Sequence, residues 1–192
     1  MFESINKNVC KNNDFTEKEM EFFNEILQHK KVPKKTFLLQ EGEICHFEAY
    51  ILKGCIRKYY INEHGLEVVL AFATEDWWVS DIASFHENKP SQLYIETLED
   101  CELLVLTTET KEQLLREVPK FERIFRLLVQ RNLSAMQNRL IDTIAKTAQE
   151  KYLEFLKLYP TLSQRVAQHH IASYLGITAE FLSKVRTKLA KQ

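Results

Sequence analysis

The residues from Thr178 to Lys188 bring hydroxyl, carboxylate and ammonium groups together on a helical surface. After the apolar residues of the segment are buried, the side chains that point outward are Thr178, Ala179, Glu180, Ser183, Lys184, Thr187 and Lys188. Hydroxyls, carboxylates and ammonium groups make hydrogen bonds to base edges, and cations also attract phosphates. This set is richer in hydroxyls than a plain Glu/Lys surface, so it predicts a contact surface for nucleic acid.

Charge is distributed unevenly along the chain, although the formal net charge is only −1. Beyond Leu162 the only acid is Glu180, whereas the basic residues are Arg165, Lys184, Arg186, Lys188 and Lys191. A local excess of positive charge suits a surface that faces phosphates. Charge alone would also fit a solvated tail.

Two helical patterns, one on each side of Gly176, would position these groups. The apolar faces are formed by Ile171, Ala172 and Leu175 and by Leu182, Val185 and Leu189. Gly176 permits the left-handed conformation that ends a helix, and Thr178 is placed to cap the next helix through its hydroxyl. The pattern predicts a helix-turn-helix, whose second helix enters the major groove of DNA. A helical hairpin within a bundle is the alternative.

Other chemistry is poorly supported by the residues. Cys10, Cys45, Cys55 and Cys101 are widely spaced, without a Cys-x-x-Cys pair, so we expect free thiols rather than a zinc site or disulfides. No pair of nucleophile and base stands out, and we predict neither an enzyme nor a bound metal or cofactor. With no apolar run long enough to span a bilayer and no signal peptide, a cytoplasmic protein without membrane contact is expected.

The rest of the chain divides into segments that differ in the spacing of their apolar residues. Thr16, with Glu19, forms a capping-box pattern for a helix that should end before Pro33. Alternating apolar residues between about 36 and 107, with glycine in the turns, predict short antiparallel strands of a sandwich or roll. Beyond Thr108 the pattern is helical.

The longest helical pattern begins near Pro119 and carries an apolar seam. The seam consists of Phe121, Phe125, Leu128, Val129, Leu133, Met136 and Leu140, at steps of three and four or their combinations. A small roll is too short to cover the whole seam, which favours a dimerisation helix. A core helix packed within one subunit is the alternative.

The whole chain resembles the Crp/Fnr family of transcription regulators, in the shorter form found in Bacteroidetes. The resemblance rests on the segment 50–57 (YILKGCIR), on Cys101-Glu102 before the last strand and on Leu175-Gly176-Ile177-Thr178. It implies an α+β fold: an N-terminal antiparallel β-roll, which is a double-stranded β-helix of the cyclic-nucleotide-binding kind, a long dimerisation helix and an all-α helix-turn-helix domain. The expected boundaries are 1–118, 119–143 and 144–192.

The same resemblance implies a homodimer that binds double-stranded DNA at a two-fold symmetric promoter site, with RNA polymerase as a possible partner. By position, the base-reading residues fall on Ala179, Glu180, Ser183 and Lys184. Relatives continue into a β-hairpin wing, whereas this sequence stops at Gln192, so we expect Arg186, Lys188 and Lys191 to compensate. The complete set of predicted DNA contacts is Gln168, His169, Ser173, Thr178, Ala179, Glu180, Ser183, Lys184, Arg186, Thr187 and Lys188.

The roll departs from relatives that bind cyclic nucleotides. Ser91 and Gln92 stand where the resemblance implies a phosphate-binding arginine and a hydroxyl, so we expect no useful binding of cyclic AMP. The effector is unknown; its predicted pocket comprises Trp78, Ser80, Asp81, Ile82, Ala83, Ser91, Gln92 and Tyr94, although the aromatic residues also suit a roll core. The alternatives to a regulator are a small-molecule or partner-binding roll with a degenerate helix-turn-helix and a cupin-like metalloenzyme.

Overall fold

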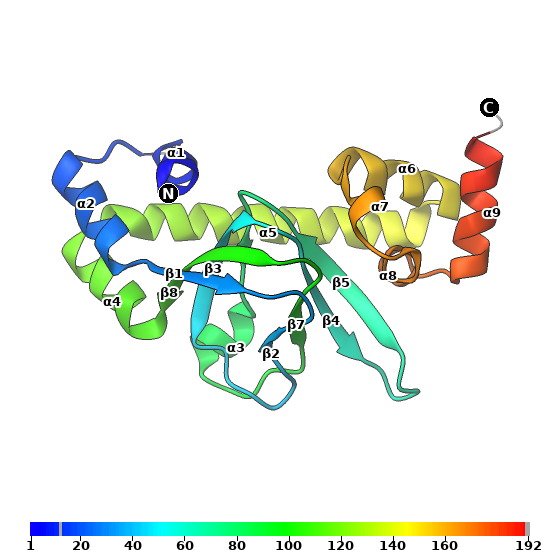
Figure 1. Ribbon diagram of the computed structural model, residues 1–192, viewed down its shortest axis with the longest axis horizontal. Coiled ribbons are helices and arrows are strands. Elements are labelled where there is room, and N and C mark those ends of the chain that lie inside the picture. The colour runs from blue at the N-terminus through cyan, green and yellow to red at the C-terminus, as the bar shows by residue number, and fades with distance from the viewer. Residues whose placement is uncertain (12, 191–192) are drawn as a thin grey trace. The chain divides into compact units, whose positions relative to one another are not determined.

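The computed structural model describes residues 1–11 and 13–190 and separates into two compact units (Figure 1). The first unit comprises Met1–Tyr60 and Phe72–Val129, and the second comprises Ile61–Ala71 and Gln130–Gln192. Lys191, which the sequence assigned to phosphate contacts, lies outside the described residues. No helix among the described residues is both long and apolar enough to cross a membrane.

In the described residues, eight strands form two four-stranded sheets, in the orders β1-β8-β3-β6 and β2-β7-β4-β5. The strands are β1 (Gln28–Val32), β2 (Phe37–Leu39), β3 (Phe47–Lys53), β4 (Ile56–Ile61), β5 (Glu67–Ala73), β6 (Trp78–Val79), β7 (Tyr94–Thr97) and β8 (Cys101–Thr107). Inward residues of both sheets, such as Ile51, Ile95 and Leu103, share one core. The predicted antiparallel roll is thereby confirmed, together with the long helix and the helices that follow it.

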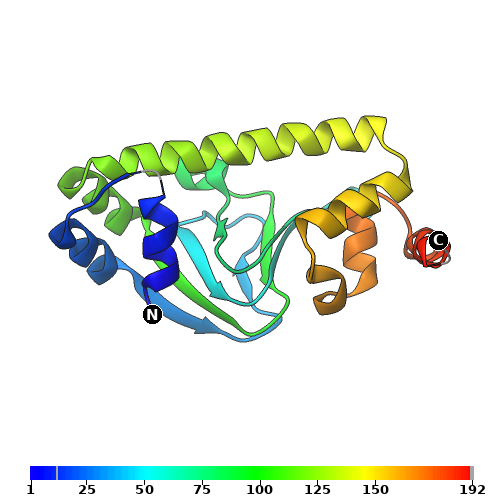
Figure 2. The same cartoon turned by 90° about the horizontal axis from the view of Figure 1, so that it is seen from above.

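A second core joins the helices of the first unit to the sheet that contains β3. These helices are α1 (Glu3–Cys10), α2 (Glu17–Ile26), α4 (Thr108–Glu117) and the start of α5 (Lys120–Ala145). Phe23, Tyr50 and Phe121 are fully buried there, and the rings of Phe23 and Phe121 lie 4.6 Å apart. Figure 2 shows α5 as one continuous helix. Its first two turns are therefore part of the core of its own subunit.

Two buried charges of the first unit form an ion pair with each other. Lys111 Nζ lies 2.8 Å from Glu48 Oε2, and the two side chains are 5% and 12% exposed. The ammonium group also lies 4.3 Å from the centroid of the Phe125 ring. Because an unpaired buried charge is strongly unfavourable, removing either partner alone would destabilise this unit.

The predicted N-terminal helix is confirmed, since the Thr16–Glu19 capping box is present and α2 ends at Ile26, before Pro33. The strand that follows it was not predicted. Gln28–Val32 forms β1, which pairs with β8 over its whole length. The polar residues of this exposed strand carry no apolar alternation, because β1 lies at the edge of its sheet.

The second unit contains the remainder of α5 and four further helices: α6 (Ala148–Leu158), α7 (Leu162–Arg165), α8 (Gln168–Leu175) and α9 (Ala179–Leu189). Pro119 precedes α5, as predicted, but α5 continues to Ala145, beyond the expected boundary at 143, and α6 begins at Ala148. Thr147 caps α6 through a capping box with Glu150. The short helices α3 (Ile82–Glu87), in the first unit, and α7 were not predicted, because each is too short to show a period.

Gly54 provides a test of the turn between β3 and β4. Its φ is +105°, and a Cβ added there would lie 2.6 Å from Cys101 Sγ and 2.9 Å from the Asp100 carbonyl oxygen. Gly42 also has positive φ, +86°, but an added Cβ would meet nothing within 4 Å. We expect Gly54→Ala to lower the free energy of unfolding by about 3–4 kcal/mol and Gly42→Ala by about 1–2 kcal/mol. Urea denaturation of both variants would measure this; equal losses would contradict the steric argument.

Candidate functional site

The turn between α8 and α9 is built as the sequence predicted. Gly176 has φ 68° and ψ 36°, the left-handed conformation that ends α8. The N–H of Ile177 donates to the Ala172 carbonyl oxygen at 3.0 Å, which closes the turn. The Thr178 hydroxyl then accepts a hydrogen bond from the Phe181 N–H at 3.2 Å. Both helix ends are thus satisfied within a few residues, so the start of α9 is held firmly.

Burial of one face of α9 leaves its polar face in solvent. Leu182 and Val185 are buried against the other helices, with exposures of 0% and 8%. Three of the predicted contact residues are half-buried: Ser173, Ala179 and Arg186. The others are exposed: Gln168, His169, Thr178, Glu180, Ser183, Lys184, Thr187 and Lys188.

Glu180 and Lys184 lie one helical turn apart on the exposed face. The pKa of Glu180 is lowered by a hydrogen bond from its own backbone N–H, by the Thr178 hydroxyl and, to a smaller extent, by Lys184. The carboxylate therefore stays ionised and able to accept a hydrogen bond at neutral pH. An acceptor and a donor are presented together, as recognition of base edges requires.

Four of the predicted contact residues border a hollow between α6, α8 and α9. These are Gln168, Ser183, Arg186 and Thr187, and the hollow has a volume of about 650 Å³. Its other lining residues are Tyr152, Leu153, Leu156, Leu189 and Ala190. The polar face of α9 thus continues into an open recess toward α6.

Ser173 makes contacts that the sequence did not predict. Its hydroxyl donates to the Glu67 carbonyl oxygen at 2.7 Å and accepts from the Val69 N–H at 3.0 Å. β5 lies at the edge of its sheet, and these bonds are made by its backbone groups. In this conformation the Ser173 hydroxyl is engaged by β5, although the residue was predicted to contact DNA.

Arg139, which the sequence analysis did not single out, joins three elements of the second unit. Its Nη2 donates to the carbonyl oxygens of Val69 and Tyr174, both at 3.0 Å. The guanidinium carbon also lies 4.1 Å from the centroid of the Tyr174 ring. Burial lowers the pKa of Arg139, although an arginine remains charged at physiological pH. Its partners lie 35 and 70 residues away, so no local pattern reveals this role.

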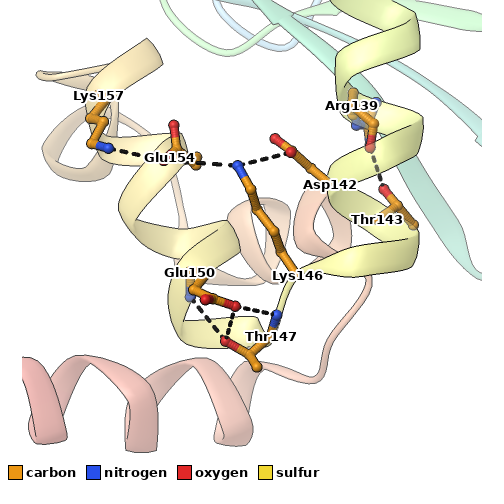
Figure 3. A network of polar contacts seen from close by, with 8 residues as sticks. All are labelled: Arg139, Asp142, Thr143, Lys146, Thr147, Glu150, Glu154 and Lys157. Carbon is orange, nitrogen blue, oxygen red and sulfur yellow. Dashed lines mark hydrogen bonds and ion pairs between the residues drawn. The ribbon is translucent and has the colours of Figure 1, made fainter.

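A polar network connects the end of α5 to α6 (Figure 3). Lys146 Nζ lies 2.8 Å from Asp142 Oδ1 and 3.8 Å from Glu154 Oε1. Thr147 and Glu150 supply the helix cap beside this lysine (Figure 3). The ion pairs are partly exposed and contribute little stability individually. Together with the cap they define where one helix ends and the next begins.

The predicted seam of α5 is only partly at the surface. Phe121 and Phe125 are 0% and 9% exposed and belong to the core of the first unit, which removes them from any surface contact. Leu128 is half-buried. Further along the helix the apolar residues are exposed: Val129 43%, Leu133 56%, Met136 51%, Leu140 61%, Ile141 59% and Ile144 78%. We call this last group the exposed seam.

In the roll, the acid of the predicted effector pocket is already bonded. Ser91 Oγ donates to Asp81 Oδ2 at 2.6 Å, and the Ser84 N–H at the start of α3 donates to Asp81 Oδ1 at 3.4 Å. Asp81 and Ser91 are 7% and 3% exposed. A cyclic phosphate needs donors in place of this carboxylate, so these residues do not fit a cyclic nucleotide.

Lys58 lies beside this cluster, although the sequence did not assign it to the pocket. It shares the inward face of β4 with Ile56, and its Nζ donates to the Ser80 carbonyl oxygen at 3.4 Å. Burial lowers its pKa below the ordinary lysine value, while the charge of Asp81 opposes the shift. The alternating pattern of β4 could have revealed that Lys58 points inward, since residues two apart in a strand share a face and Ile56 is buried.

Two of the remaining pocket residues, Trp78 and Tyr94, make their ring contacts elsewhere. The Trp78 ring packs against Tyr50 and Phe125, in the core beneath α5. Tyr94 stacks on Tyr59 at 5.0 Å, on the opposite face of β7 from the buried Ile95. Three others complete the predicted set: Ala83 and Gln92 are exposed, and Ile82 is half-buried. No group of three or more His, Cys, Asp or Glu in the described residues is arranged to hold a metal ion.

Comparisons with known proteins extend over most of the chain. Residues 29–118 match the family described as the cyclic nucleotide-binding domain. The fumarate and nitrate reduction regulatory protein of Vibrio cholerae serotype O1 is 25% identical over 187 residues, covering 91% of this chain and 74% of that protein. The cAMP-activated global transcriptional regulator CRP of Salmonella typhimurium is 23% identical over 139 residues, covering 72% of this chain and 63% of that protein. The solved structure of FixK2 from Bradyrhizobium japonicum has a TM-score of 0.77 at 17% identity, covering 87% of this chain and 86% of the other.

The cap at Thr178 can be tested by Thr178→Ala. Loss of the hydrogen bond to the Phe181 N–H should lower the free energy of unfolding by about 1 kcal/mol. Thr161→Ala is the matched control, because Thr161 occupies the N-cap of α7 without a side-chain cap bond. The control should change stability by less than about 0.5 kcal/mol. Urea denaturation curves distinguish the two, and a control loss as large as that of Thr178→Ala would refute the capping role.

Proposed function

Because this chain belongs to the Crp/Fnr family of transcription regulators, we propose that it binds a two-fold symmetric promoter site as a homodimer. Each subunit inserts α9 into the major groove, while α8 crosses the DNA backbone. The protein acts in the cytoplasm as a non-enzymatic regulator, with RNA polymerase as its further partner. The β-roll, the dimerisation helix and the DNA-binding domain divide the chain at 118/119 and 143/144.

The observation that carries this proposal is the firmly capped start of α9 with an exposed polar face. Thr178 holds the first turn of the helix, and Glu180 and Lys184 project from the side opposite the buried Leu182 and Val185. Specific DNA readers require this combination, because base contacts depend on a fixed helix position as well as on suitable groups.

The individual contacts follow from side-chain chemistry. The ionised Glu180 accepts from a cytosine amino group, and Lys184 donates to the O6 or N7 of guanine. Ala179 is too short to replace a long polar reader, so the preferred sequence differs from that of relatives with such a residue. Arg186 and Lys188 bind phosphates, which positions the helix without specifying sequence.

The exposed seam supports the homodimer. Leu133, Met136 and Leu140 are each more than half exposed and recur at steps of three and four along one helix. Contiguous apolar surface of this kind marks an interaction site in soluble proteins. A parallel pair of α5 helices would cover the seam at a two-fold axis, and a dimer of this kind would place its half-sites about 34 Å apart.

Cyclic AMP is not the effector of this roll. A cyclic phosphate placed beside Asp81 would meet a carboxylate that is bonded to Ser91 rather than an arginine. The Salmonella relative is by name cAMP-activated, so the difference is one of ligand chemistry within a shared fold. The pocket residues best placed to bind a polar ligand are those around Ser80 and Asp81.

The proposed function is tested by selecting bound sequences from random DNA and footprinting the result. We expect two protected half-sites about one helical turn apart, and an affinity that falls steeply with salt as counterions are released. Lys184→Ala should lower specific affinity by about 1–3 kcal/mol and relax selection at one base pair. Lys18→Ala removes the same charge from an exposed position on α2 and should leave the selected DNA sequence unchanged. Salt-independent binding without a selected sequence would favour a partner-binding module instead.

A second prediction concerns the ligand. Isothermal titration calorimetry with cyclic AMP should give no binding at micromolar concentrations, because Asp81 and Ser91 replace the donors that the phosphate needs. The Salmonella relative, titrated under the same conditions, is the positive control. Micromolar binding by this chain would show that the cluster rearranges to accept a cyclic nucleotide.

A further inference from the structure

Phe181 is an apolar side chain in the first turn of a helix whose exposed face is otherwise polar. It is 48% exposed, whereas its neighbour Leu182 is completely buried. A half-exposed phenyl ring is unfavourable in water and is not needed to hold α9, because Leu182 and Val185 already form its buried face. The ring therefore calls for an explanation beyond the packing of the helix.

The ring lies beside the charges proposed to contact DNA. Phe181, Lys184 and Lys188 follow one another at steps of three and four, so they form one stripe along α9. Both lysines are exposed. The backbone of Phe181 is held by the helix cap, since its N–H donates to the Thr178 hydroxyl at 3.2 Å. An apolar side chain is thus presented next to cations, which suits a polyanion better than an apolar protein surface.

The apolar group that the major groove offers is the C5 methyl of thymine. We propose that Phe181 reads a thymine in each half-site by contact between its ring and this methyl group. The inference rests on the proposed function, because it requires α9 to lie in the groove. It adds an apolar reader on the flank of the helix to the polar readers Glu180 and Lys184. The adjacent Ala179 is short and does not compete for the same space.

The test uses deoxyuridine, which pairs as thymidine does but lacks the methyl group. In the sequence selected by the full chain, each thymidine is replaced singly, and the dissociation constant is measured for the wild type, Phe181→Ala and Phe181→Leu. At one position in each half-site the wild type should lose about fourfold in affinity, the effect of burying one methyl-sized group. Phe181→Leu keeps an apolar contact, so its affinity should still fall when deoxyuridine replaces thymidine at that position.

Phe181→Ala should bind more weakly than the wild type and respond equally to thymidine and deoxyuridine at that position. The other thymidine positions are the internal control, because both proteins should respond alike there. Two outcomes would overturn the inference. Either Phe181→Ala keeps the wild type's sensitivity to the methyl group at every position, or the substitution lowers affinity equally for thymidine and deoxyuridine DNA at every position, as expected of a ring that packs on the sugar or faces a protein. If neither protein binds any DNA, the proposed function fails instead.

Discussion

The turn from Gly176 to Thr178 is the constraint on which the candidate site depends. A helix leaves backbone groups unpaired at both ends, and two helices joined by so short a connection must satisfy them within a few residues. The left-handed Gly176 returns the chain toward Ala172, and the Thr178 hydroxyl takes up a free N–H of α9. The direction of α9, and with it the placement of Glu180 and Lys184, follows from these bonds. A helix that recognises base edges must hold such side chains in accurate positions.

The roll shows how a fold is kept while its chemistry changes. The strands and the short helix α3 that surround the cluster are present, but the polar groups at its centre satisfy one another. The Ser91 hydroxyl donates to the Asp81 carboxylate, and Lys58 donates to the Ser80 carbonyl oxygen. Internal pairing makes the site stable without a ligand, since buried polar groups are costly only when they lack partners. Similarity to a domain that binds cyclic nucleotides therefore identifies the fold, while the side chains determine the ligand.

Local features were recoverable from sequence, and long-range ones were not. The caps at Thr16 and Thr178 depend on residues three positions away, so their patterns are visible in the sequence. Periodicity identified the seam of α5 but gave no sign that Phe121 packs inside its own subunit whereas Leu133 does not. The β1 strand was missed because an exposed edge strand needs no apolar alternation. The partner of Ser173 on β5 is 104 residues away, beyond the reach of any local pattern.

The contacts of Ser173 and Arg139 have a consequence for how the chain behaves among its own copies. A free strand edge is a template on which another chain can add a strand, and proteins block such edges to stay dispersed. On β5, the hydroxyl of Ser173 occupies the Val69 N–H and the Glu67 carbonyl oxygen, while Arg139 occupies the Val69 carbonyl oxygen. Any motion that lifts α8 from β5 uncovers these groups at once. The same contact that steadies α8 thus also guards the chain against aggregation.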